Sequence, residues 1–155
     1  MFYGEYEYTI DQKARVTIPP KFREAFKGGI VLLRGYDKCI TACTVAEWDK
    51  RAEHLSRLSP TQSKTRRLNR ATFSSAFSLD LDGQGRVVLP APLRQYAGIA
   101  FVAFPSNRAE SFLNEVAVVG VRDCLEIWSK KDWLVEQQLM SEQVWQIAES
   151  IEDRA

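Results

Sequence analysis

Short stretches in which apolar and polar residues alternate recur along the chain, and this alternation is typical of half-buried β-strands. Residues 6–10 (YEYTI) and 77–81 (FSLDL) show the alternation. Each is followed by a second short strand that a proline ends, at residues 15–19 and 86–90. More continuous apolar runs predict further strands at residues 29–35, 39–43, 115–121 and 124–128. The pattern therefore predicts a similar set of strands in each half of the chain.

Short helical segments follow the proline-ended strands. Residues 20–26 and 91–98 predict short helices with proline in the first turn, and Gly98 is placed to end the second. Residues 59–62 (SPTQ) predict the start of a longer helix between the two halves.

Two further helices have a capping signal at their first turn. Thr44 stands three residues before Glu47, and Ser129 stands three residues before Asp132. In this arrangement the hydroxyl accepts a hydrogen bond from a free backbone N–H of the helix. Trp48 falls on the apolar face of the first helix, where we expect it to belong to the core. The mixture of strands and helices predicts an α+β fold.

Two segments of nearly the same sequence indicate an internal repeat. DQKARVTIPPKFR begins at Asp11 and DGQGRVVLPAPLR begins at Asp82. The similarity continues in the later segments GYDKC, from Gly35, and GVRDC, from Gly120. Beyond them, Trp48 matches Trp133. Two copies of one supersecondary unit make a duplicated module. We expect the first unit at residues 1–75 and the second at 76–155.

In each unit, a turn that begins with aspartate joins the first two strands. The carboxylate can accept hydrogen bonds from backbone N–H groups of the turn, and glycine can adopt the positive φ that such turns need. An arginine follows four residues after the aspartate, a spacing that suits an ion pair. The predicted turn-shaping residues are Asp11, Asp82, Gly83 and Gly85.

The second turn also resembles the opening of a calcium-binding EF-hand loop. A calcium site is not expected, because Ala91 stands where a bidentate glutamate is required and Thr9 stands at the position of Asp80 in the first copy. The single histidine, His54, has no partner that would make a zinc site or a catalytic pair. We therefore expect no metal, no cofactor and no enzymatic activity.

The composition and the cysteine content indicate the cellular compartment of the protein. The hydrophobic content of 45% is sufficient for a buried core. Cys39, Cys43 and Cys124 are an odd number of cysteines, which favours buried thiols in a reducing compartment over a disulfide framework. The sequence has no apolar run near the roughly 20 residues that cross a bilayer and no secretory signal at its start. We expect a cytoplasmic protein with no membrane partner.

Charge is distributed unevenly although the net charge is only +1. Residues 1–109 contain 17 Lys and Arg against 10 Asp and Glu, whereas residues 110–155 contain 4 against 10. This division indicates a basic working surface and an acidic C-terminal region. Residues 57–75 hold five basic residues and no acidic one, which fits a solvated helix face, a phosphate-facing surface or a subunit contact.

The twin turns are candidates for nucleic-acid recognition. Arginines at the base of a strand can present guanidinium groups to phosphates and guanine edges. The alternative is that these arginines only pair with the aspartates of their own turns, and both can hold, since an orienting carboxylate reduces the entropy lost on binding. The candidate contacts are Arg15 and Arg86, flanked by Lys13, Lys21, Arg23 and Arg94.

Across nearly the whole chain, these motifs resemble the bacterial MraZ family. The resemblance is carried by MFYGEYEYTIDQKARVTIPPKFRE, RGYDKCI and DLDGQGRVVLPAPLRQYAG. It implies a relative of the AbrB and SpoVT proteins, whose swapped-hairpin β-barrel is usually made by two chains. Here two internal repeats would form this barrel within one chain, with flanking helices.

The same resemblance implies a function and an assembly. It implies a sequence-specific, nucleoid-associated transcriptional regulator that forms homo-oligomeric rings. The expected partner is double-stranded DNA, bound at short direct repeats upstream of the division and cell-wall gene cluster. By position, the DxxxR motifs correspond to Asp11 with Arg15 and to Asp82 with Arg86, and Lys13 matches the family's usual lysine.

Two positions and one segment depart from the family pattern. Ala14 replaces the glycine before the first arginine, so we expect this turn to be less able to adopt positive φ. Gln84, the remaining candidate DNA contact, stands at the position of Lys13 and leaves the second turn one charge weaker. Residues 104–115 (FPSNRAESFLNE) look inserted, and we expect a surface loop or hairpin there.

Two other functions stay open on the sequence. An AbrB-like antitoxin or partner-binding oligomeric module would co-purify with a partner and assemble independently of salt. An enzyme built on a double-psi barrel would need a polar pocket, which the sequence does not indicate.

Overall fold

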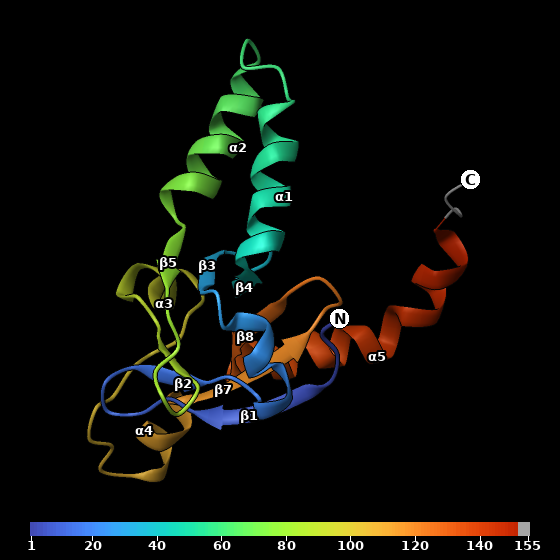
Figure 1. The fold of residues 1–155 in the computed structure, drawn as a ribbon. Helices are drawn as coiled ribbons and strands as arrows, with labels where there is room; N and C mark the ends of the chain where they lie inside the picture. Colours follow the sequence, from blue (N-terminus) through green and yellow to red (C-terminus); the bar gives the residue numbers. More distant parts are fainter. Residues whose placement is uncertain (152–155) are drawn as a thin grey trace.

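The structure is a computed structural model that describes residues 1–151 (Figure 1). Its strands are β1 (Glu5–Thr9), β2 (Arg15–Thr17), β3 (Ile30–Arg34), β4 (Ile40–Thr44), β5 (Phe77–Leu79), β6 (Arg86–Val88), β7 (Glu115–Gly120) and β8 (Leu125–Ser129). Its helices are the 3-10 helix η1 (Pro20–Phe26), α1 (Val45–Ser56), α2 (Ser63–Ser74), α3 (Ala91–Tyr96), α4 (Arg108–Leu113) and α5 (Lys130–Ser150). The predicted α+β class is confirmed.

The two repeats exchange their first strands within one antiparallel sheet. The strand order is β1-β7-β8-β4-β3-β5, so β1 of the first repeat pairs with β7 of the second. Reciprocally, β5 of the second repeat pairs with β3 of the first. The central pair β4–β8 joins the halves, with Ile40 opposite Ile127. Neither repeat completes its own sheet, since each needs a strand from the other to cover an open edge.

A second, two-stranded sheet is made by β2 and β6. Val16 lies directly opposite Val87, and these two residues occupy the same position in the two repeats. The pairing is therefore related by a local two-fold axis that passes between these valines. Both valines are almost fully buried, as are Ile18 and Leu89 at the ends of the strands.

One continuous hydrophobic core fills the space between the two sheets and the short helices. It draws on both repeats, and burying each large aliphatic side chain stabilises the fold by about 1.5–3 kcal/mol. The largest fully buried side chains are Phe26, Ile18, Ile30, Leu32, Ile40, Leu89, Leu93, Leu125, Ile127, Val16, Val87 and Val116. The alternation seen in the sequence thus places its apolar members in a core that the two repeats share.

The predicted caps of α1 and α5 are confirmed. The backbone N–H of Glu47 donates to Thr44 Oγ1 at 3.1 Å, and that of Asp132 donates to Ser129 Oγ at 3.1 Å. Trp48 is half-buried, less than expected, and its ring packs edge-on against Phe73 of α2.

The predicted start of α2 is wrong by several residues. The helix begins at Ser63 after Gln62, which makes no side-chain cap. The Ser59 hydroxyl instead bonds to the Thr61 hydroxyl at 2.7 Å, and the Arg66 guanidinium donates to the carbonyl of Pro60 at 2.9 Å. Residues 59–62 therefore form the turn between two antiparallel helices.

The expected loop or hairpin at residues 104–115 contains the helix α4 instead. Asn107 Oδ1 accepts from the N–H of Glu110 at 2.9 Å, and the Glu110 carboxylate accepts from the N–H of Ser106 at 2.7 Å. This is a reciprocal capping arrangement. Asn114 then ties the segment down, because its side chain bonds to both backbone groups of Val102, at 2.9 and 2.7 Å.

Two arms leave the body of the molecule (Figure 1). One is the hairpin of α1 and α2, and the other is α5, which ends well away from that hairpin. The base of α5 is held to β1, since Trp133 Nε1 and Gln137 Nε2 both donate to the Glu5 carboxylate, at 2.6 and 2.9 Å. Within residues 1–151, no helix has the length and apolar character to cross a bilayer.

The three cysteines are buried, as expected. Cys43 lies in β4, and Cys39 and Cys124 immediately precede β4 and β8. All three are free thiols.

Candidate nucleic-acid interface

The first turn is organised around the carboxylate of Asp11. Asp11 Oδ1 accepts from the backbone N–H groups of Lys13 and Arg15 at 2.9 and 3.0 Å. Asp11 Oδ2 accepts from Arg15 Nε at 2.8 Å. The backbone closes as well, because the N–H of Ala14 donates to the carbonyl of Asp11 at 2.9 Å. The side chain and the carbonyl of Asp11 therefore accept four hydrogen bonds from within the turn.

The second turn repeats this geometry atom for atom. Asp82 Oδ1 accepts from the N–H groups of Gln84 and Arg86, both at 2.9 Å. Asp82 Oδ2 accepts from Arg86 Nε at 2.9 Å, and the N–H of Gly85 donates to the Asp82 carbonyl at 3.0 Å. Two sequences with different tip residues therefore make the same turn.

The expectation that Ala14 would resist positive φ is wrong. Ala14 has φ 57° and Gly85 has φ 75°, so both lie in the left-handed region. For a residue with a Cβ this conformation costs roughly 1–2 kcal/mol, which the hydrogen bonds of the turn offset at Ala14.

The glycine of the second turn is required for a different reason. A Cβ at position 85 would collide with the side chain of Arg23, which packs across the turn. On the opposite side, the equivalent arginine, Arg94, has its guanidinium 5.0 Å from the centre of the Phe101 ring. Ala14 therefore does not meet the same obstruction.

Each arginine also reaches the aspartate of the other turn. Arg15 Nη1 lies 3.4 Å from Asp82 Oδ2, and Arg86 Nη1 lies 3.5 Å from Asp11 Oδ2. The backbone supports this cross-bracing, because Ile18 donates to the carbonyl of Gly85 at 2.9 Å. We call Asp11, Arg15, Asp82 and Arg86 the quartet.

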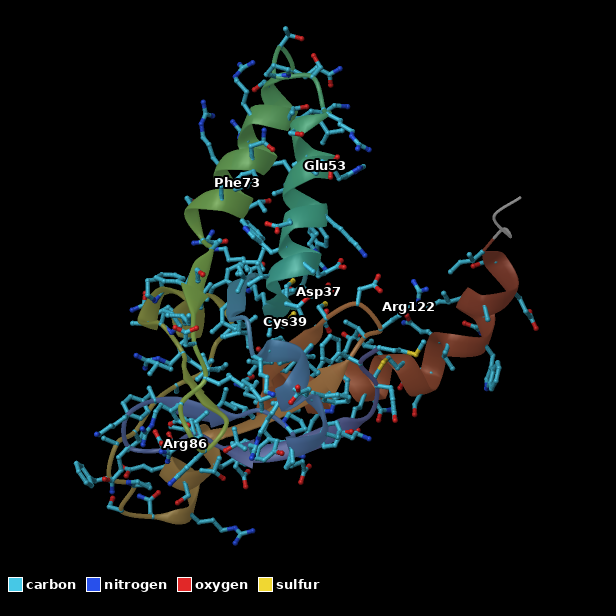
Figure 2. The ribbon with its side chains drawn as sticks, in the orientation of Figure 1. Asp37, Cys39, Glu53, Phe73, Arg86 and Arg122 are labelled. Atoms are coloured by element: carbon cyan, nitrogen blue, oxygen red, sulfur yellow. The ribbon has the colours of Figure 1, made fainter. Side chains whose placement is uncertain are left out.

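The quartet lies at the end of the molecule opposite the α1–α2 hairpin. Arg86 lies in β6, which pairs with β2, and Figure 2 shows it far from Glu53 and Phe73 on the hairpin. The arginine and aspartate side chains of the quartet are 23–32% exposed. The two turns are therefore held side by side at one surface, partly open to solvent.

The pKa values of both aspartates are lowered. Burial raises the pKa of Asp11, but hydrogen bonds from the Arg15 and Lys13 backbone and the Arg15 guanidinium outweigh it and hold the pKa below 3.8. For Asp82, the backbone N–H of Arg86 is the main cause of a pKa below 3.8, and burial opposes it. The quartet is therefore ionised at neutral pH, and its two negative and two positive charges cancel.

The quartet arginines are fixed rather than free. In each, Nε and Nη1 are held by carboxylates. Nη2 of Arg15 and of Arg86 has no hydrogen-bond partner among residues 1–151 and remains able to donate outward.

The side chains at the turn tips point into solvent. The side chains of Lys13 and Gln84 are exposed. Only the backbone N–H groups of these residues donate hydrogen bonds to the aspartates. Gln12 is exposed beside Lys13 and was not among the predicted contacts. The matching residue in the second copy is Gly83, so the two repeats share no side chain at this position.

The remaining predicted contacts lie outside the quartet. Arg23 Nε donates to the carbonyl of Ile18, and Arg94 Nε to that of Leu89, both at 3.0 Å, so these arginines brace the ends of β2 and β6. The Lys21 ammonium lies 4.4 Å from the centre of the Tyr3 ring, a cation–π contact. Within the described part of the chain, no group of acidic, histidine and cysteine side chains is arranged to hold a metal ion.

Comparison with known proteins identifies the family. The family described as "MraZ protein, putative antitoxin-like" matches twice, at residues 1–71 and 72–154. A protein of Dehalococcoides mccartyi named "Transcriptional regulator MraZ" is 45% identical over 154 residues, which covers 99% of each chain. Proteins with the same name from Thermomicrobium roseum and Herpetosiphon aurantiacus are 37% and 41% identical, over 97% and 86% of this chain and 97% and 84% of theirs. The chain belongs to the MraZ family.

Proposed function

We propose that this protein is a sequence-specific DNA-binding transcriptional regulator and that the twin turns contact the DNA. The observation that carries the proposal is the cross-braced quartet, which holds two turn tips side by side with exposed polar side chains. The relatives named transcriptional regulators support the same function. The proposed function involves no catalysis.

The quartet and the tips have different roles in this proposal. Because the charges of the quartet cancel, it adds rigidity but no net attraction for phosphate. Lys13 supplies the positive charge, and Gln84 has the donor and acceptor pair that can bind an adenine edge in the major groove. Nη2 of each quartet arginine donates to a phosphate or a base from a fixed position, which reduces the entropy lost on binding.

The exchange of strands between repeats supports a swapped-hairpin β-barrel of the AbrB type within one chain. In this proposal residues 1–75 and 76–155 are the two repeats, and β2 and β6 meet on the local two-fold axis. The DNA-binding surface is made from both repeats, so neither repeat carries it alone.

We further propose a homo-oligomeric ring that acts in the cytoplasm on the nucleoid. Its target would be short direct repeats upstream of the division and cell-wall gene cluster. Several subunits that each contact one repeat would add weak contacts through a high effective concentration.

A second candidate, an antitoxin-like partner-binding module, is favoured by the description of the matched family. It predicts a stable complex with a second protein and an assembly that salt does not affect. The two candidates can be distinguished by purifying the protein from its own cells. Its affinity for DNA and the proteins that co-purify with it are then measured on the same sample.

The test is a fluorescence-polarisation titration of the protein against its own upstream region and a scrambled duplex, each at two salt concentrations. We expect preference for the upstream region and a logarithm of affinity that falls with the logarithm of salt by about 0.9 per neutralised phosphate. Equal affinity for both duplexes would show that binding is not sequence-specific and would contradict that part of the proposal.

A further inference from the structure

The outer part of α5 is an apolar arm with nothing packed against it. Beyond Gln137 its side chains are all exposed within the described residues, and Trp145 is 79% exposed. The other large exposed apolar side chains of α5 are Leu134, Val135, Leu139, Met140, Val144 and Ile147. A helix with apolar residues on more than one face is normally covered by other protein. The arm therefore lacks its packing partner in a single chain.

The same arm is acidic. Residues 132–151 contain Asp132, Glu136, Glu142 and Glu149 and no Lys, Arg or His. Glu142 precedes Trp145 by three positions and Glu149 follows it by four, so both carboxylates lie on the same helix face as the indole. A partner surface that suits this face combines an apolar recess with a positively charged rim.

Such a recess lies at the base of the α1–α2 hairpin. A cavity of about 280 Å³ opens between β3, β4 and the two helices. Leu33 and Leu55 contribute apolar walls, and Arg34, Lys50 and His54 lie around it as basic residues. The last three are all exposed.

The one acidic residue that lines this cavity is already paired. Glu47 Oε1 lies 3.5 Å from Arg51 Nε, and Arg51 Nη2 also lies 3.4 Å from Cys124 Sγ. The remaining basic residues of the rim therefore have no carboxylate among the cavity's lining residues to neutralise them.

The arm does not fill the cavity of its own chain. Figure 1 shows α5 and the hairpin as two arms that diverge from the body, with the outer end of α5 far from α1. An arm and a recess of complementary charge and apolar character on different sides of one chain fit together between two copies.

We propose that the α5 arm of one copy docks on a second copy and inserts Trp145 into the cavity at the base of the α1–α2 hairpin. Glu142 and Glu149 then face the rim formed by Arg34, Lys50 and His54. Tryptophan is one of the side chains enriched among the residues that contribute most to binding at protein interfaces, where it fills a desolvated pocket. The contact is head-to-tail, and repetition of a head-to-tail contact gives a ring when the rotation closes.

This inference rests on the homo-oligomer of the proposed function and adds the residues that make it. The partner that fits is a second copy, because the cavity pairs apolar walls with a basic rim, as the acidic apolar arm requires. A small anionic ligand in the cavity would leave the α5 arm uncovered.

The test is a mixing experiment followed by size-exclusion chromatography with light scattering. Trp145→Ala removes the inserted residue but keeps the cavity, and the double variant Lys50→Glu/His54→Glu alters the cavity but keeps the tryptophan. We expect each variant alone to be monomeric at concentrations where the wild-type protein is oligomeric. When the two variants are mixed, the tryptophan of one can dock only in the cavity of the other, so each pair of chains has one intact contact. We therefore expect complexes of two chains and no larger species.

Matched controls carry equivalent changes elsewhere. Phe104→Ala shortens an aromatic side chain that is 75% exposed and lies outside both α5 and the cavity, and Lys64→Glu reverses a charge on α2 outside the cavity, so both are expected to assemble like the wild type. Circular dichroism checks that the variants fold, and Glu142→Lys/Glu149→Lys, expected to be monomeric, replaces Trp145→Ala if the latter does not fold.

Three outcomes overturn the docking. The first is that Trp145→Ala assembles like the wild type. The second is that the mixture stays monomeric although both variants fold, and the third is that the control variants lose assembly to the same extent. A wild-type protein that is monomeric overturns the proposed homo-oligomer itself. Affinity for a duplex with a single repeat is expected to be unchanged in Trp145→Ala, which separates a failure of docking from a failure of DNA binding.

Discussion

At the scale of single residues, Asp11 and Asp82 organise the proposed DNA-binding surface. Each carboxylate accepts hydrogen bonds from two backbone N–H groups and from two guanidinium groups. One of the two guanidinium groups belongs to the other repeat. The spacing of aspartate and arginine predicted the pair within each turn. It could not predict the pair between turns, because that contact depends on how β2 and β6 meet in the folded chain.

The lowered pKa values of these aspartates predict a loss of stability in acid. A carboxyl whose folded pKa lies below its unfolded value of 3.8 contributes stability that is complete above that value and is lost as the pH falls through the folded pKa. We expect the wild-type protein to melt at a higher temperature than Asp11→Asn/Asp82→Asn at pH 7. The difference should shrink as the pH falls below about 4. Thermal unfolding over a pH series measures it, and a difference that stays constant with pH would contradict this assignment.

Gly85 is predicted to be the least replaceable residue of the turns. Gly85→Ala introduces a Cβ at positive φ and into the space of the Arg23 side chain, so we expect a loss of about 2 kcal/mol or more in the free energy of unfolding. Gly83→Ala is the control, because it has no neighbour within 4 Å and no positive φ. Urea unfolding compares the two, and equal effects would show that the packing of Arg23 is unimportant.

At the scale of elements, the sequence predicted most strands and helices but not their partners. Alternation, continuous apolar runs, strand-ending prolines and capping residues are local patterns, so they located β1 to β8 and the starts of α1 and α5. The pairing of β1 with β7 joins residues far apart in sequence, and no local pattern specifies it. The helix α4 could have been predicted, because Asn107 and Glu110 have capping-box spacing. It was missed because the segment was interpreted only as an insertion.

The segment that contains α4 is predicted to be held mainly by Asn114. This side chain is only 4% exposed and satisfies the N–H and the carbonyl of Val102. We expect Asn114→Ala to cost about 1–3 kcal/mol, since both backbone groups lose their partners. Asn107→Ala, which removes only the cap, should cost about 1 kcal/mol. Urea unfolding and limited proteolysis of residues 99–107 measure these effects, and wild-type behaviour of Asn114→Ala would contradict the role given to it.

At the scale of the whole molecule, the two proposed interaction surfaces are separate. The quartet and the turn tips form one, and the cavity at the base of the α1–α2 hairpin, lined by residues of β3, β4, α1 and α2, forms the other. The uneven charge of the sequence was interpreted as a basic working surface and a separate acidic region. In the structure the acidic residues 132–151 form an arm, and the quartet itself is neutral, so in the proposed function the attraction for DNA comes from the side chains that flank the quartet.

The most direct test of the central claim is a polarisation titration of Lys13→Ala/Gln84→Ala against the upstream direct repeats. Both side chains are exposed, so the variant should keep its fold, and Lys64→Ala on α2 is the matched control. We expect the control to bind like the wild type and the double variant to lose tenfold or more in affinity, since each such contact is worth about 1–3 kcal/mol. A double variant that folds and binds the repeats with wild-type affinity and salt dependence would contradict recognition by the turns.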